Sequence, residues 1–267
     1  MRGARPFWTC VSQFRTLTDM PEFWLGVVLS ILALGLGGTI KGATGAGVPI
    51  VAVPIMALFF DVQTAVIIML LPSLVANILQ GWKYRKHLAE SGFSWRFAAA
   101  GAVGGFVGSL MLTNISPQVL LLMVAVVVVL YIGFRLARPG WRLPLTTARR
   151  IALPVGALAG TLQGATGVSA PVSITFLNAT GLPRAGFVAV ISLFFVASTT
   201  SQITVLASYD VLTLNGLMLS SGALAIILAT MPIGEALAKR VSPTLFDRLI
   251  LVLLTLVAAR ILLGALL

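Results

Sequence analysis

Eight apolar runs, each close to the length of a membrane-spanning helix, restrict what this sequence can fold into. They cover residues 24–40, 62–81, 97–113, 117–134, 151–168, 186–207, 211–231 and 243–266. About 20 apolar residues cross the hydrocarbon core of a bilayer as a helix, whereas the strands of a membrane barrel alternate over about ten residues. Because 58% of the residues are hydrophobic and only 9% are charged, the sequence predicts an all-α polytopic membrane protein.

The basic residues predict orientation rather than a nucleic-acid partner, although the net charge is +11. They gather between the apolar runs, where lysine and arginine mark cytoplasmic loops. An N-terminus outside places the following residues in the cytoplasm: Lys83, Arg85, Lys86, Arg96, Arg135, Arg138, Arg142, Arg149, Arg150, Lys239 and Arg240. An N-terminus inside, with four crossings in each half, is an alternative that fits the charges about equally well.

One glycine-rich phrase occurs twice, as GTIKGATGAGVP from Gly38 and as GTLQGATGVSAP from Gly160, 122 residues later. The two stretches agree at seven of twelve positions, and the same offset pairs Gln80 with Gln202. An offset of 126 residues aligns GSLMLTNISP with GEALAKRVSP. The repetition predicts two homologous halves. The chain then divides into an N-terminal tail (1–22), a first transmembrane repeat (23–138), a basic linker (139–150) and a second transmembrane repeat (151–267).

Each half contains an apolar run, the glycine-rich phrase, a short apolar piece and three full-length runs. The short pieces, 50–60 and 172–180, reach roughly 16 Å as helices, well under the ~30 Å of hydrocarbon. They either return to the same side as part of a re-entrant hairpin or are extended by their neighbours into a crossing. Both arrangements give an odd number of crossings. Because broken helices at matching positions are typical of inverted-repeat transporters, we expect inverted repeats.

The repeated phrase predicts a helix that is interrupted inside the membrane. Its glycines permit backbone angles that other residues avoid, and Pro49 and Pro171 suit the first turn of a new helix. The start of such a helix carries unpaired N–H groups and a partial positive charge, which attract an anion. Since irregular backbone at this depth must be buried or line a cavity, we expect the two breaks to meet at one anion pocket between the halves.

Lys41 lies at the first break, where a buried cation is costly unless an anion accompanies it. Backbone, hydroxyl and amide groups nearby complete the predicted substrate-binding set: Lys41, Gly42, Thr44, Gly45, Gly47, Pro49, Asn77, Gln80, Gln163, Gly164, Thr166, Gly167, Ser169, Pro171 and Gln202. Structural roles are the alternatives. Lys41 would snorkel to the interface, the threonines would bond to their own helices, and the glutamines would bond between helices.

Catalysis and cofactors find no support in the sequence. Cys10 is the single cysteine and lies in the tail, so no disulfide, thiol pair or metal cluster is predicted. The fingerprints of metalloproteases, α/β-hydrolases, P-loop proteins and dinucleotide-binding proteins are missing from the sequence. The tail has neither the uninterrupted apolar region nor the cleavage site of a removable signal peptide. We therefore expect a protein that is not an enzyme and binds no cofactor or metal.

Two longer stretches carry a family resemblance. GLGGTIKGATGAGVPIVAVPIM and GALAGTLQGATGVSAPVSITFL resemble the paired glycine-rich signatures of the sulfite exporter TauE/SafE family of bacterial membrane permeases. The resemblance implies a duplicated polytopic fold in the cytoplasmic membrane. It also implies transport, mostly outward, of sulfite, sulfoacetate and other organosulfur or carboxylate anions. It points to the glycines and prolines of both phrases, although Ser169 and Ala170 depart from the family's glycine pattern.

These observations lead to one functional hypothesis with two alternatives. We expect a secondary transporter, most simply an exporter, that moves a small anion such as sulfite, sulfoacetate or a related organosulfonate by alternating access. An anion channel with a fixed pore and a membrane accessory subunit without transport activity are the alternatives. The expected partners are the small anion and the lipid bilayer, with no nucleic acid, and a homo-oligomer is compatible with the sequence.

Overall fold

The structure is a computed structural model that describes residues 20–88, 91–137, 141–237 and Thr255. Most of the predicted tail and the last apolar run, 243–266, lie outside the described residues. The described part is helical and contains no strand. Its elements are α2 (Met20–Thr44), α3 (Val48–Phe59), α4 (Val62–Ile68), α5 (Leu70–Tyr84), the 3-10 turn η1 (Arg85–His87), α6 (Ser91–Asn114), α7 (Pro117–Ala137), α8 (Leu145–Thr166), α9 (Ala170–Ala179), α10 (Arg184–Ser208) and α11 (Leu214–Leu237).

Six helical stretches within the described residues are long and apolar enough to cross a membrane. They are Pro21–Thr44, Val62–His87, Gly92–Asn114, Pro117–Phe134, Arg184–Ser208 and Leu214–Leu237. The predicted run 151–168 falls mostly in α8, which is not one of the six. Its first six residues, LTTARR, include two threonines and two arginines, and the apolar remainder is only about 24 Å long. The chain is therefore an all-helical, multi-pass membrane protein.

The outer surface of the helices is apolar and several polar side chains are buried. Trp24, Leu130 and Leu214 are 58%, 64% and 74% exposed, while Lys41 and Gln163 are buried. A water-soluble protein shows the opposite distribution, because burial of unpaired polar groups is costly. The exposed apolar side chains suit contact with lipid, and the buried polar groups mark the interior where a site is to be sought.

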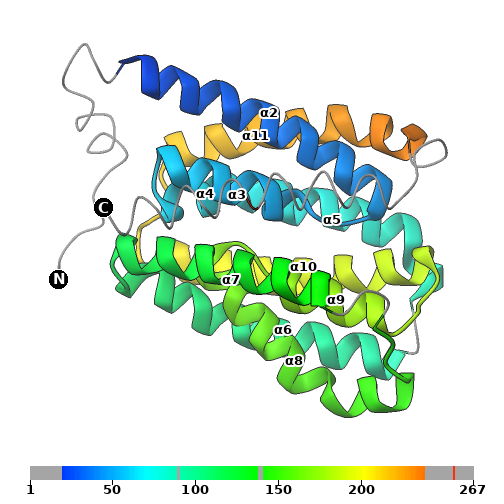
Figure 1. Cartoon of the computed structure of the whole chain (residues 1–267). Coiled ribbons are helices and arrows are strands. Elements are labelled where there is room, and N and C mark those ends of the chain that lie inside the picture. Colours follow the sequence, from blue (N-terminus) through cyan, green and yellow to red (C-terminus); the bar gives the residue numbers. More distant parts are fainter. Residues whose placement is uncertain (1–19, 89–90, 138–140, 238–254, 256–267) are drawn as a thin grey trace.

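Both glycine-rich phrases interrupt helices, as predicted. Helix α2 ends at Thr44, and Gly45 and Gly47 then adopt positive φ angles of 93° and 115° before α3 begins. Helix α8 ends at Thr166, and Gly167 follows with a φ of 71°. Only glycine adopts these angles without strain. After the first break α3 packs against α2, and after the second α9 packs against α8 (Figure 1).

The first helix of each half packs against a helix of the other half. Helix α2 contacts α11, and α8 contacts α6. A methyl group on Gly42 would overlap the carbonyl of Met231, and one on Gly164 would overlap that of Gly105. These two contacts are equivalent. Gly42 and Gly164 are 122 residues apart, and Met231 and Gly105 are 126 residues apart, which are the two offsets that align the halves in the sequence. Small residues let helix backbones approach closely in membranes, and these glycines do so at the same points in both halves.

The reverse contacts repeat the same correspondence. A methyl group on Gly234 would overlap the carbonyl of Thr39, and one on Gly108 would overlap that of Thr161. Thr39 and Thr161 stand at equivalent positions of the repeated phrase. The two interfaces between the halves are therefore built from equivalent positions in the same register.

The close contact at Gly108 gives a test of this packing. Gly108→Ala is expected to lower the unfolding temperature in detergent, because the new methyl group forces α6 away from α8 at a cost of about 1–3 kcal/mol. Gly222→Ala is the matched control, since nothing lies within 4 Å of the position of its added methyl group. The control should unfold at or slightly above the temperature of the unmodified protein, because alanine favours the helix. Equal unfolding temperatures for the two variants would contradict the described contact.

Candidate functional site

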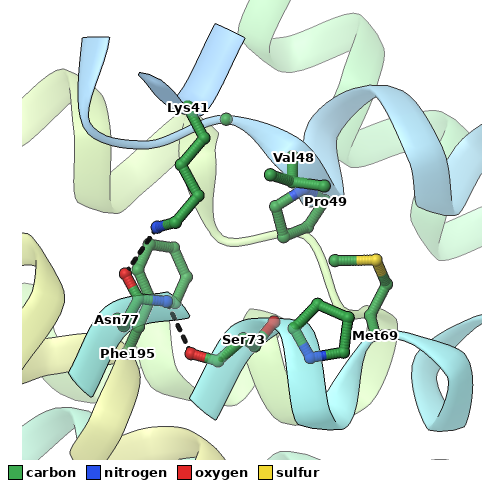
Figure 2. A pocket seen from close by; sticks show the side chains of 9 residues that line it. Lys41, Val48, Pro49, Met69, Ser73, Asn77 and Phe195 are labelled. Carbon is green, nitrogen blue, oxygen red and sulfur yellow. Dashed lines mark hydrogen bonds between the residues drawn. The ribbon is translucent and has the colours of Figure 1, made fainter. Parts of the chain in front are cut away.

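The side chain of Lys41 is buried inside the protein, one turn before the first break (Figure 2). It is 3% exposed, which rules out the alternative that it snorkels to the interface in the described conformation. Its Nζ donates to Asn77 Oδ1 on α5 at 2.7 Å and lies 3.5 Å from the Gly45 carbonyl oxygen. Asn77 Nδ2 in turn donates to the Ser73 carbonyl oxygen at 2.6 Å. This chain of bonds aims the amide oxygen of Asn77 at the ammonium.

The partners of the Lys41 ammonium are neutral. The ion pair found among the described residues joins Lys83 to Glu235 at 3.0 Å on the exposed surface. No acidic residue is among the described residues that line the cavity beside Lys41. A buried charge is stabilised poorly by neutral oxygens alone. The site therefore has an excess of positive charge that an anion would neutralise.

The N-terminus of α3 faces the same cavity as Lys41. Gly47 is the N-cap residue and supplies no side-chain hydrogen bond, while Pro49 occupies the first turn as predicted. The first N–H groups of a helix lack partners within the helix and carry a partial positive charge. Figure 2 shows Val48 and Pro49 beside Lys41, with Ser73 and Asn77 opposite. The cavity among these residues has a volume of about 10 Å³, which is roughly the room for one water molecule.

The glutamines hold the broken helices in place. Gln80 Nε2 donates to the Lys41 carbonyl oxygen at 3.4 Å, and Gln202 Nε2 donates to the carbonyl oxygens of Gln163 and Gly164 at 3.4 and 3.1 Å. These carbonyls belong to the last turns of α2 and α8, and those of Lys41 and Gln163 also accept from the N–H groups of Gly45 and Gly167. The bonds fit the interhelical alternative for the glutamines, and they are equivalent in the two halves.

The threonines of the repeated phrase bond within their own helices. Thr44 Oγ1 donates to the Ile40 carbonyl at 2.9 Å, and Thr166 Oγ1 donates to the Leu162 carbonyl at 2.8 Å. Each hydroxyl also accepts from a backbone N–H two residues on, at Ala46 and Val168 respectively. Their hydroxyl donors are therefore used by the chain itself, as in the alternative considered from the sequence.

The second break lacks the charge of the first. Gln163 stands where the first half has Lys41, and Thr199 stands where it has Asn77. Gln163 Oε1 and Thr199 Oγ1 are buried and have no hydrogen-bond partner in the described part of the chain. The start of α9 resembles that of α3, because the N-cap residue Ser169 supplies no side-chain capping hydrogen bond to the helix. The two breaks therefore differ in charge and not in helix capping.

The two breaks share neither the small cavity at Lys41 nor a larger cavity beside the first break. Lys41, Gly47, Pro49 and Asn77 line the small cavity, whereas Gln163, Gly164, Thr166, Gly167, Ser169, Pro171 and Gln202 line neither. Apolar side chains occupy the space beside the second break. The position of a Cβ added to Gly167 lies 3.1 and 3.3 Å from the side chains of Val66 and Val53. The structure thus brings four predicted residues of the first half to the small cavity, whereas Thr44 lines the larger one and Gly42, Gly45 and Gln80 line neither. The predicted residues of the second half lie apart from both cavities.

A second, larger cavity of about 360 Å³ also borders the first break, at Thr44, Ala46 and Gly47. Gly47 lines both cavities. Arg184, at the start of α10, also lines the larger one and donates from Nη2 to the Gly42 carbonyl oxygen at 3.0 Å. Sequence reasoning missed this arginine, because an arginine between apolar runs looks like any other basic loop residue. The sequence carries no signal that its side chain reaches the end of α2, more than 140 residues away.

The comparison with known proteins gives one result. Residues 30–261 match the model of the family described as "Sulfite exporter TauE/SafE". No curated protein and no solved structure matches the chain.

The hydrogen bond between Lys41 and Asn77 can be tested by substituting Asn77 and the equivalent residue of the second half, Thr199. Asn77→Leu should lower the unfolding temperature, because it leaves a buried ammonium without its closest acceptor, a loss of about 1–3 kcal/mol or more. Thr199→Val removes a hydroxyl that has no partner and should be neutral or stabilising. Thermal unfolding of both variants in the same detergent is the measurement. A Thr199→Val variant as unstable as Asn77→Leu would show that the two positions are not as described.

Proposed function

Because the chain belongs to the sulfite exporter TauE/SafE family and is a multi-pass membrane protein, we propose that it is a transporter that exports a small anion. The anion is sulfite, sulfoacetate or a related organosulfonate, moved across the cytoplasmic membrane of a bacterium. The observation that carries the proposal is the buried Lys41 ammonium, held by neutral oxygens beside the uncapped start of α3. An oxyanion bound there would receive a charge-assisted bond from the ammonium and bonds from backbone N–H groups.

The size of the cavity at Lys41 favours alternating access over a fixed pore. A volume of about 10 Å³ accommodates a water molecule and is too small for a sulfonate group. An anion can enter only if the surrounding helices move apart, which a transporter does in each cycle. A channel requires a continuous path in its open state. The described conformation therefore corresponds to a state in which the site is closed.

Inverted repeats are the second part of the proposal. Two features support them. Each half contributes its first helix to an interface with the other half, and the contacts at Gly42 and Gly164 are equivalent. Helices α2 and α8 also begin at opposite ends of the bundle (Figure 1). Rocking of one inverted half against the other would open the Lys41 site to each side in turn.

The role of Lys41 is tested by anion flux into proteoliposomes. Lys41→Gln should lower the flux of sulfite or sulfoacetate at least tenfold, because a charge-assisted bond is worth roughly 1.5–3 kcal/mol. Lys41→Arg should retain part of the flux because it keeps the charge. Lys83→Gln is the matched control, since it removes a lysine whose partner is an exposed glutamate, and its flux should be unchanged.

The outcomes of this assay separate the alternatives. Flux that saturates and can be driven by counter-transport supports a transporter, whereas unsaturated electrical conductance indicates a channel. An absence of flux of any tested anion by the unmodified protein would favour the accessory subunit. Unchanged flux in Lys41→Gln would remove Lys41 from the mechanism.

The orientation of the halves is tested by labelling single cysteines with an impermeant reagent in a Cys10→Ser background. Inversion, with the N-terminus outside, predicts that cysteines at His87 and Leu145 react from the cytoplasmic side and those at Ile115 and Leu212 from the outside. All four positions lie at or next to helix ends. Labelling of His87→Cys and Ile115→Cys from the same side would contradict the proposed arrangement.

A further inference from the structure

The larger cavity, of about 360 Å³, has a polar mouth and an apolar interior. Thr44, Asn178 and Arg184 line it and are exposed. Ile40 and Ile50 line it and are buried. The remaining described lining residues include Ala46, Ile174, Leu182 and Phe187, which add to the apolar wall. A cavity of this size, with few polar groups at one end, is typical of a site for a small organic molecule.

The charge at the mouth is positive. Arg184 Nη2 donates to the neutral carbonyl oxygen of Gly42 at 3.0 Å, and no acidic residue is among the described residues that line the cavity. A guanidinium presents five N–H donors in a planar fork that matches carboxylate and sulfonate oxygens. One backbone carbonyl uses only part of this capacity. The mouth can therefore accept an anionic group without displacing a competing carboxylate.

We propose that this cavity is a second anion site, specific for organic sulfonates or carboxylates that carry an apolar portion. Arg184 binds the anionic group at the mouth, and the wall formed by Ile40, Ile50 and Ile174 binds the carbon chain. The inference rests on the proposed function, because Gly47 lines both this cavity and the one at Lys41. The proposed site would bind organic anions more tightly than inorganic anions such as sulfite, because sulfite has no carbon chain to contact the apolar wall of the cavity.

The bond between Arg184 and Gly42 also connects the two sites. Gly42 follows Lys41 directly on the last turn of α2. The guanidinium has further N–H donors, so it can bind an anion while Nη2 keeps its bond to the Gly42 carbonyl. An anion in the larger cavity would therefore be held by a side chain that also contacts the end of α2 next to Lys41.

Binding of an alkylsulfonate series to the purified, full-length protein in detergent tests the proposal without depending on transport. The probes are sulfite and methane-, ethane-, propane- and butanesulfonate, measured by isothermal titration calorimetry. Affinity should rise roughly three- to fourfold with each added methylene group, because each is buried against the apolar wall. Arg184→Gln should weaken the binding of every organosulfonate at least tenfold. Arg150→Gln, an exposed arginine that lines neither cavity, is the charge-matched control and should bind as the unmodified protein does.

A steric variant keeps the test independent of the Arg184 contact with α2. Ile174→Phe adds bulk to the apolar wall and should reverse the preference for butanesulfonate over methanesulfonate, while the binding of methanesulfonate changes little. Equal affinities across the series in the unmodified protein would overturn the proposal. Unaltered binding in a folded Arg184→Gln variant would also overturn it.

The outcomes for this site and for the proposed transport function can be told apart. Lys41→Gln is expected to lose flux while still binding butanesulfonate in the larger cavity. Chain-length-dependent binding that requires Arg184, in a protein without flux of any anion, would support the site and contradict the transport function. If the flux is lost in Lys41→Gln, but the affinity for alkylsulfonates changes neither with chain length nor in Arg184→Gln, the proposed second site is contradicted and the transport function is not.

Discussion

The absence of water from the hydrocarbon core is the constraint on which this structure depends, because it forces every interrupted backbone to find partners within the protein. The chain has two such interruptions, at 45–47 and at 167–169. Gln80 and Gln202 supply donors to the carbonyls at the ends of α2 and α8. Glycines let α11 and α6 approach these helices closely enough to exclude lipid. Close helix packing and the glutamine hydrogen bonds thus both stabilise the interrupted helices, and each half contains both features.

The repeated backbone carries side chains that have diverged. Helix ends, glutamine bonds and glycine contacts correspond between the halves. At the positions of Lys41 and Asn77 in the first half, however, the second half has Gln163 and Thr199. The requirement to satisfy the backbone acts on both halves equally, whereas a single charged group is enough to attract a small anion. This explains how an almost symmetric scaffold comes to hold an asymmetric site, with the charge on one side only.

The sequence predicted the helical breaks well, because glycine and proline act locally on backbone angles. It also predicted that Lys41 and Asn77 belong to one region, since both are polar residues in apolar surroundings. Two features were beyond it. The second break lines neither cavity and packs against Val53 and Val66, an arrangement that depends on contacts between distant helices. The position of Arg184 depends in the same way on the fold of the whole chain, so no local pattern marked it.

Gly47 forms part of the wall of both cavities and has a φ of 115°. Glycine brings no side chain to either wall, so a larger residue there would add bulk to both cavities at once. A side chain at this φ is strained in any case, and an added Cβ would lie 2.8 Å from the Ile40 side chain. One substitution at this position would therefore disturb the Lys41 site, the larger cavity and the start of α3 together.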